Sequence, residues 1–149
     1  MTIYLASDHA GFELKNLLKN HLKHPKIIDL SLKFDQFDDY PLVAYNLAQK
    51  IQKDDFAIAL CGTGEGICMA LNRFKHIRAA TVGSLKIAKI VRKHNHANII
   101  CLPARSLSLE KAIKLIEVFL KTKNSLDQRH VRRVAELSLR GEDLISNLL

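Results

Sequence analysis

The sequence lacks tryptophan and has only three tyrosines and three cysteines among its 149 residues. No apolar run approaches the ~20 residues that span a bilayer, and the first residues lack the basic-then-apolar order of a signal peptide. These absences predict a soluble, cytoplasmic protein with no membrane partner. Because the cysteine number is odd and no C-x-x-C pair occurs, we expect reduced thiols, with Cys68 and Cys101 as small buried apolar groups.

The sequence does contain enough apolar residues for one core, together with an excess of basic residues. The hydrophobic fraction of 48% predicts a single domain over residues 1–149. The formal net charge of +8 favours an anionic partner and by itself leaves open nucleic acid, acidic lipid and a small phosphorylated metabolite. Aromatic residues are scarce and do not alternate with basic ones, which argues against a platform that stacks single-stranded nucleic acid.

Short apolar segments alternate with amphipathic ones along the chain. Strands are expected at residues 3–7, 26–31, 56–61, 77–82 and 98–103. Helices are expected at residues 12–22, 41–51, 67–74, 84–94 and 108–120, and from about residue 127 onward. Strands that alternate with helices form βαβ units with right-handed crossovers. The predicted fold is therefore α/β: a doubly wound, Rossmann-like parallel sheet of five strands with helices on both faces.

Polar clusters directly follow three of the expected strands. Asp8 and His9 follow the first strand, "CGTGEG" from Cys61 follows the third, and Arg105 follows the fifth. Ligands of open α/β sheets bind beyond the carboxyl ends of the strands. Turns are polar in any protein, but they do not require Asp, His, Cys, Thr and Arg to gather at one edge. We therefore interpret these clusters as a binding site.

The glycine-rich turn is neither of the two common nucleotide motifs. Ile67 occupies the position where G-x-G-x-x-G needs glycine, and no Gly-Lys-Ser/Thr follows. A strand, a glycine-rich turn and a helix start still form an anion cradle, because backbone N–H groups point outward. The positive electrostatic potential of these N–H groups is expected to make the Cys61 thiol ionise easily, so that it can serve as base or nucleophile. Thr63 and adjacent N–H groups could hold an oxyanion.

Two other interpretations of the site involve the histidines of "RKHNHAN". A Cys/His/Asn hydrolase could pair Cys61 with His94 and Asn95, but the flanking sequences match no cysteine protease signature. A metal site at His94 and His96 is disfavoured, because residues two apart on a helix face different directions and no thiolate pair completes the set. No metal is predicted.

Two arginines in the last expected helix narrow the ligand further. Arg129 and Arg133 stand four apart on one helix face, a like-charge pair that an anion between them would relieve. Arginine forks match phosphate oxygens, although a solvated basic helix would look the same. Together with the cradle and the thiol, these arginines favour an acid–base enzyme that acts on a small phosphate ester.

Six segments, in order and across nearly the whole chain, carry a family resemblance: "ASDHAGFELK", "DYP", "LCGTGEGICMALNRF", "IRAA", "RKHNHANI" and "RHVRRV". They resemble the type B ribose-5-phosphate isomerase family, which also includes galactose-6-phosphate isomerase subunits. The resemblance implies interconversion of ribose 5-phosphate and ribulose 5-phosphate without metal or other cofactor. It also implies a homodimer or homotetramer with sites between subunits, and a helix from about residue 127 that packs on a neighbouring subunit.

The resemblance also implies a role for each matching position. Cys61 matches the base that moves a proton through a cis-enediolate, and Thr63 lies beside the amides that hold the enediolate oxygen. His94 matches the residue that opens the furanose ring, helped by Asp39. The positions that match substrate contacts are Asp8, His9, Gly62, Thr63, Gly64, Glu65, Gly66, Asn95, Arg105, Arg129 and Arg133.

The chain departs from the family pattern at a few of these places. Glu65 stands where a small or apolar residue is usual, and we expect its carboxylate to point to solvent rather than replace Cys61. His96 stands where the family usually has Asp, and "PAR" and "DQRH" replace glycine-rich segments. These changes leave open an isomerase of allose 6-phosphate or galactose 6-phosphate, and a non-catalytic module that binds a phosphate ligand or nucleic acid.

Overall fold

The apolar segment "FAIALC" forms the central strand of a parallel sheet. The computed structural model describes residues 1–139, in which this strand, β3 (Phe56–Cys61), is flanked by β1 (Ile3–Ser7) and β5 (Ile99–Pro103). β2 (Ile27–Asp29) and β4 (Ala79–Thr81) lie at the edges and give the order β2-β1-β3-β5-β4, all pairs parallel. The five-stranded parallel sheet predicted from the sequence is confirmed.

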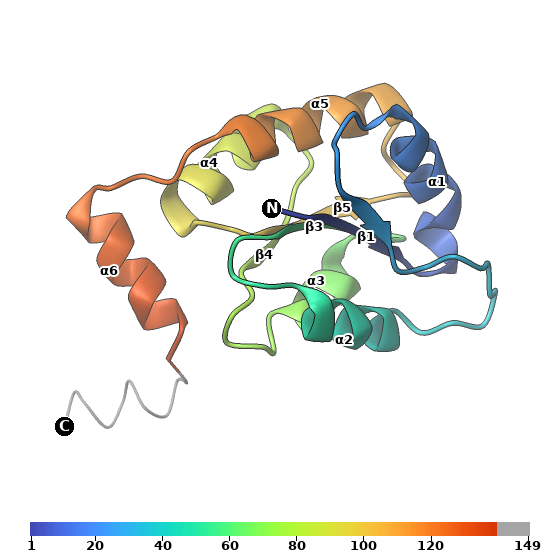
Figure 1. Cartoon of the computed structure of the whole chain (residues 1–149), viewed down its shortest axis with the longest axis horizontal. Helices are drawn as coiled ribbons and strands as arrows, with labels where there is room; N and C mark the ends of the chain where they lie inside the picture. The colour runs from blue at the N-terminus through green and yellow to red at the C-terminus, as the bar shows by residue number, and fades with distance from the viewer. Residues whose placement is uncertain (140–149) are drawn as a thin grey trace.

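The helices cover both faces of the sheet, as predicted (Figure 1). One face carries α1 (Phe12–His21), α4 (Leu85–Asn95) and α5 (Leu109–Lys121), and the other carries α2 (Tyr40–Lys50) and α3 (Glu65–Leu71). A short 3₁₀ turn, η1 (His9–Gly11), links β1 to α1. The last described helix, α6 (Gln128–Leu137), stands apart from the body and contacts it through α4.

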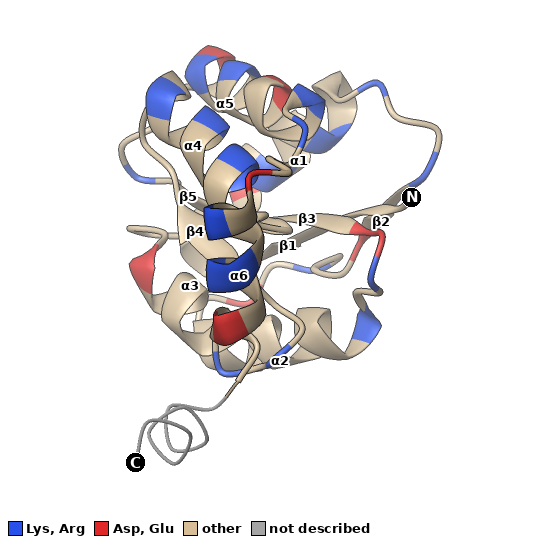
Figure 2. Ribbon diagram, turned by 90° about the vertical axis from the view of Figure 1, so that its left-hand side faces the viewer, with Lys and Arg blue, Asp and Glu red and all other residues tan. Residues whose placement is uncertain are grey.

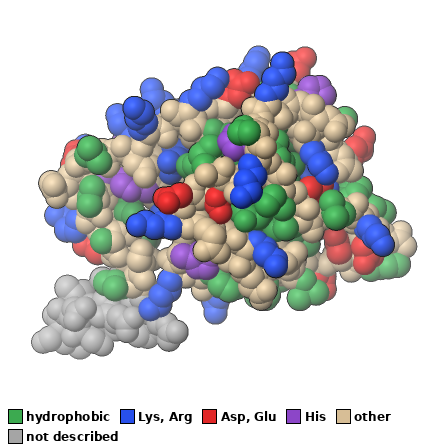
Figure 3. Space-filling view, in the orientation of Figure 1, with side chains coloured by type: hydrophobic (Ala, Val, Ile, Leu, Met, Phe, Trp, Pro, Cys, Tyr) green, Lys and Arg blue, Asp and Glu red, His purple; other side chains and the backbone are tan. Residues whose placement is uncertain are grey.

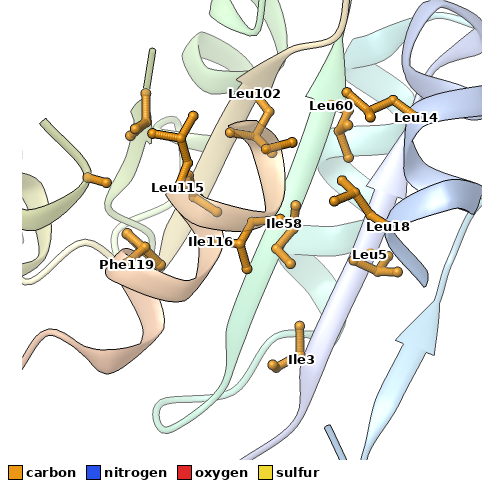
Figure 4. Close-up of a cluster of buried hydrophobic side chains, with 14 of the residues drawn as sticks. Ile3, Leu5, Leu14, Leu18, Ile58, Leu60, Leu102, Leu115, Ile116 and Phe119 are labelled. Atoms are coloured by element: carbon orange, nitrogen blue, oxygen red, sulfur yellow. The ribbon is translucent and has the colours of Figure 1, made fainter. Parts of the chain in front are cut away.

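The two faces of the sheet bury side chains of different size, because successive residues of a strand point to opposite faces. The face under α1, α4 and α5 is filled by large side chains (Figure 4). On the opposite face the strands contribute mostly small side chains, namely Ala6, Ala57, Ala59, Cys61 and Cys101. Small side chains leave room for α2 and α3 to pack close to the sheet, and only residues 62–64 separate the end of β3 from the start of α3.

Most helix starts follow the signals in the sequence. The hydroxyls of Ser84 and Ser108 accept hydrogen bonds from backbone N–H groups in the first turns of α4 and α5. α3 differs from its prediction, since it begins at Glu65 rather than Ile67 and ends at residue 71. It ends there because the Asn72 amide hydrogen-bonds to both backbone groups of Ala79, which turns the chain into β4. β2 and β4 each contain three residues, fewer than the six predicted for each.

Among residues 1–139, no helix is both long enough and apolar enough to cross a membrane. All three cysteines are buried free thiols, which confirms the burial predicted for Cys68 and Cys101.

A buried ion pair joins α1 to the loop that follows β2. Lys15 is fully buried, and its Nζ lies 2.9 and 2.8 Å from the carboxylate oxygens of Asp29 and 2.6 Å from the carbonyl oxygen of Ser31. Burial alone would raise the pKa of Asp29, but hydrogen bonds from Lys15, from the Ser31 N–H and from Lys19 hold it below its ordinary value. The pair therefore stabilises the folded state only while Asp29 is ionised.

Replacing Lys15 by methionine (Lys15→Met) is expected to lower the free energy of unfolding by about 3 kcal/mol at pH 7, because Asp29 would remain as a poorly compensated buried charge. Because the pKa of Asp29 is depressed, its contribution disappears as the pH falls below about 4, and the gap from wild type should narrow there. Urea unfolding of both proteins, at pH 7 and at a pH below about 4, measures the difference in the free energy of unfolding. Lys19→Met is the control: its partly exposed ammonium binds the same carboxylate, so the loss should stay under ~1 kcal/mol.

Candidate active site

The candidate site lies where the chain leaves β1 and β3 in opposite directions. β1 and β3 are neighbours, but the chain passes from β1 outward to β2 and from β3 toward the other edge. The carboxyl ends of two such strands are the place where open α/β sheets bind their ligands. The structure brings the following predicted residues to this end of the sheet: Asp8, His9, Asp39, Cys61, Gly62, Thr63, Gly64, Glu65, Gly66 and Arg105.

Cys61 is the last residue of β3, and the turn that follows folds back over its sulfur. The Gly64 N–H donates to Cys61 Sγ at 3.2 Å, and the side chain is almost wholly buried. The loop after β5 is bonded to the same turn: the Ala104 N–H donates to the Cys61 carbonyl and the Arg105 N–H to the Gly62 carbonyl. The thiol is therefore held in a fixed position between two strand ends.

The three glycines are explained largely by groups of the protein itself. A Cβ on Gly62 would lie 3.0 Å from Cζ of Arg105, and one on Gly66 would lie 2.7 Å from the ring of Tyr40. Gly64 has φ of +78°, and a Cβ there would also press on the backbone of β5. The sequence predicts that a ligand approaches this backbone, whereas the structure shows Arg105, Tyr40 and β5 already in contact with it.

Glu65, the first residue of α3, is exposed, as predicted. Its carboxylate accepts a hydrogen bond from Thr81 Oγ1 at 3.2 Å, which turns it toward β4. Thr63 is exposed at the tip of the turn, and its hydroxyl accepts from the Glu65 N–H. Thr63 therefore faces solvent at the mouth of the turn, where it can reach a ligand.

A second thiol lies beneath the turn, but it faces the sheet. A hydrogen bond with Cys101 lowers the pKa of Cys68 to about 7, against the opposite effect of burial. Burial raises the pKa of Cys101 well above its ordinary value. Cys68 belongs to the hydrophobic core between α3 and the sheet, so we assign it a packing role, in contrast to Cys61 in the turn.

Asp8 and His9 begin the loop after β1. Asp8 is buried, and burial raises its pKa even though its Oδ1 accepts from the Gly11 N–H. His9 Nδ1 lies 2.9 Å from Oδ1 of Asp38, and this hydrogen bond raises the pKa of the imidazole. A carboxylate that accepts from the ring favours a protonated His9, which suits an anionic ligand.

The remaining predicted residues lie at the opposite edge of the sheet. His94 and Asn95 end α4 just before β5 begins, so they lie at the amino end of the strands. β5 has five residues, which separate the two edges by roughly 16 Å at ~3.3 Å per residue. Within one chain, the structure therefore does not bring His94 or Asn95 together with Cys61.

Arg129 and Arg133 belong to α6, which lies beside this amino edge (Figure 1). His130 of α6 stacks flat on His94, with ring centroids 4.2 Å apart and an interplanar angle of 4°. His96 ends α4 in a left-handed conformation, and its Nε2 lies 3.0 Å from the Ser125 carbonyl oxygen. His96 thus anchors the segment that leads into α6.

A cavity of about 940 Å³ opens at the amino edge, between α6 and the body. Its lining includes Asn95 and three basic residues, Arg73, Lys75 and Arg78. These side chains give the cavity a positive charge, so this edge also suits an anion. The predicted site residues are therefore divided between the two edges of the sheet, most of them at the carboxyl edge and His94, Asn95, Arg129 and Arg133 at the amino edge.

Three residues near the site were missed by sequence reasoning. Asp38 binds His9, the Tyr40 ring covers Gly66, and His130 stacks on His94. The segments "DDY" and "RHVRR" contain them, but nothing in those letters shows which distant side chain each one meets. Across residues 1–139, no three His, Cys, Asp or Glu side chains gather as a metal site.

These features define an α/β protein with a buried thiol in a glycine-rich turn, at the point where the connections from two neighbouring parallel strands run in opposite directions. The family model described as Ribose/Galactose Isomerase matches residues 3–137. The chain belongs to this family.

Relatives cover the chain almost end to end. A Mycoplasma genitalium protein named probable ribose-5-phosphate isomerase B is 41% identical over 141 residues, which are 91% of this chain and 92% of that protein. The structure of ribose 5-phosphate isomerase B from Thermotoga maritima is 40% identical, with a TM-score of 0.86 over 92% of this chain and 97% of that one. The Mycoplasma genitalium enzyme, solved with bound ribulose-5-phosphate, is 40% identical, with a TM-score of 0.85 over 92% and 93% of the chains.

Replacing Gly64 by alanine (Gly64→Ala) is expected to lower the free energy of unfolding by ~1–3 kcal/mol, because alanine is strained at positive φ and its methyl would meet the β5 backbone. Urea unfolding measures the loss. Gly83→Ala is the matched control, since a Cβ there meets nothing within 4 Å, and it should change stability by less than ~1 kcal/mol. Equal effects of the two substitutions would contradict the strained turn.

Proposed function

We propose that this protein is an aldose–ketose isomerase that interconverts ribose 5-phosphate and ribulose 5-phosphate. The observation that carries the proposal is the Cys61 thiol, held in a glycine-rich turn at the carboxyl end of β3 beside Arg105. Relatives named ribose-5-phosphate isomerase B, including one with bound ribulose-5-phosphate, support the same substrate.

The proposed chemistry moves one proton between adjacent carbons. A hydrogen on the carbon next to a carbonyl is weakly acidic, so its removal needs a base within hydrogen-bond reach. Cys61 as thiolate would take the proton from C2 of the open-chain aldose, leaving an enediolate with its charge on O1. The hydroxyl proton of O2 would pass to O1, and the thiol would return its proton to C1, which gives the ketose. Backbone N–H groups of the turn and the Thr63 hydroxyl would stabilise the enediolate oxygen.

The phosphate end of the substrate is assigned to the basic side chains around the turn. The Arg105 guanidinium lies against Gly62, and His9, whose pKa is raised by its hydrogen bond with Asp38, stands at the end of β1. Binding energy from the phosphate, which does not react, would orient the sugar carbons against Cys61. Asp8 is proposed to contact the sugar.

We further propose that a complete site needs two copies of the chain. His94 and Asn95 lie at the amino edge beside α6, which carries Arg129 and Arg133, whereas Cys61 lies at the carboxyl edge. The length of β5, roughly 16 Å, separates the two edges and is too great for one sugar phosphate to touch both. In a homodimer, or a pair of dimers, the amino edge and α6 of one copy would meet the carboxyl edge of the other. His94, helped by Asp39 of the other copy, would then open the sugar ring.

The surface over α2 and α3 suits contact with a second copy. Each of these helices contains a single charged residue, whereas Lys and Arg gather on α4, α5, α1 and α6 (Figure 2). The space-filling view shows basic side chains along the rim over α4 and α5 (Figure 3). Leu42, Tyr45 and Met69 are exposed apolar side chains on the weakly charged face, and Met69 is 70% exposed.

The departures from the family pattern are compatible with a five-carbon substrate. Glu65 is turned toward Thr81, and His96 is engaged with the Ser125 carbonyl. Both side chains therefore have structural partners outside the turn that would hold the sugar. An isomerase of six-carbon sugar phosphates is the alternative to be compared in the same assay.

Replacing Cys61 by serine (Cys61→Ser) is expected to lower kcat for ribose 5-phosphate at least ~100-fold, because a general base contributes 10²–10⁴ in rate. KM should stay within about two-fold, since the phosphate contacts remain. A coupled assay for ribulose 5-phosphate, run with a chelator present, measures both constants. Cys68→Ser is the matched control and should retain turnover; a fully active Cys61→Ser protein would refute the thiolate base.

Mixing two inactive variants tests the shared site. In a hybrid of Cys61→Ser and His94→Asn chains, one of the two sites receives both native residues and the other receives neither. Random exchange of subunits should therefore restore about a quarter of wild-type activity. The assay follows turnover after the two proteins are unfolded together and refolded. Absence of recovery, with hybrids demonstrated by mass, would mean that each chain builds its site alone.

A further inference from the structure

One carboxylate oxygen binds His9 twice. Oδ1 of Asp38 lies 2.8 Å from the His9 backbone nitrogen and 2.9 Å from ring Nδ1. Since a carboxylate only accepts, the ring must carry its proton on Nδ1 when this bond forms. The double contact fixes the rotation of the ring as well as the position of its backbone, and it directs Nε2 away from Asp38.

The loop that carries Asp38 is anchored before it reaches His9. At its base Lys15 holds Asp29, and Ser31 Oγ accepts from the Ser7 N–H at 3.0 Å, at the end of β1. Farther along, the ring of Phe34 packs edge-on against the ring of Phe12, with centroids 5.6 Å apart. Asp38 is therefore delivered to His9 by a supported segment.

The electrostatics agree with this geometry. The charged side chains that act on the His9 ring are Asp38 from the loop and Asp8 from the end of β1, and both raise the pKa of the imidazole. A protonated ring donates from both nitrogens, so Nε2–H is available to an anion while Nδ1–H is bound.

We propose that Asp38 is a positioning residue for the isomerase reaction: it holds the His9 imidazole protonated and oriented, so that Nε2–H donates to the phosphate of the substrate. This inference rests on the proposed function, in which His9 binds the phosphate end. Asp38 itself need not touch the substrate.

The test uses Asp38→Asn, which keeps an acceptor oxygen and the side-chain shape but removes the charge. The His9 resonance, identified by its loss in His9→Gln, is titrated by NMR in the full chain. The pKa of His9 should fall in Asp38→Asn and stay unchanged in the surface control Asp54→Asn. KM for ribose 5-phosphate should rise ~5-fold at a pH between the two His9 pKa values that the titration gives, and scarcely change below both, while kcat changes little.

Two results would overturn the proposal. One is an unchanged His9 pKa in Asp38→Asn, and the other is a rise in KM that is the same at every pH, as a merely structural defect would produce. Inorganic phosphate, added as a probe during the NMR titration, separates this inference from the proposed function because it needs no turnover. A His9 resonance that phosphate shifts less in Asp38→Asn supports the positioning role even if isomerisation fails, and a resonance that phosphate does not move in wild type refutes it.

Discussion

All five strands run in one direction, and the placement of every candidate residue depends on this constraint. Parallel strands put their carboxyl ends at one edge of the sheet. Loops that are far apart in the sequence therefore lie close together at that edge. The same rule sends the end of each crossover helix to the other edge. Cys61, at the end of a strand, and His94, at the end of a crossover helix, therefore lie at opposite edges of the sheet.

The buried face under α2 and α3 shows how packing serves the turn. Its strand residues are mostly small, which leaves room for α3 close to the sheet, and α3 starts at Glu65, shortly after Cys61. Gly64 then allows the chain to reverse at once, and its N–H reaches the sulfur. A larger residue at Ala59 or Cys101 would push α3 outward and lengthen that turn.

Much of the fold could be predicted because it is encoded locally. The apolar run "FAIALC", the cap residues Ser84 and Ser108 and the spacing of α5 are signals within a few residues. The boundaries predicted for β2, β4 and α3 were less accurate than those of the other elements. α3, for example, ends through a hydrogen bond from Asn72 to Ala79, which no local sequence pattern predicts. The candidate residues at the carboxyl edge could be grouped from the sequence, because in a parallel sheet the loops after the strands meet at that edge.

The sequence by itself determined the class of fold, the residue types of the site and the family they resemble, because these depend on local periodicity and on motifs in order. Only the tertiary structure decided that Asp38 hydrogen-bonds to His9, that His130 stacks on His94 and that the candidate residues are divided between opposite edges of the sheet. These are contacts between side chains brought together by the packing of separate elements. Their distances follow from the direction of the strands and the path of the loops, which no single segment encodes.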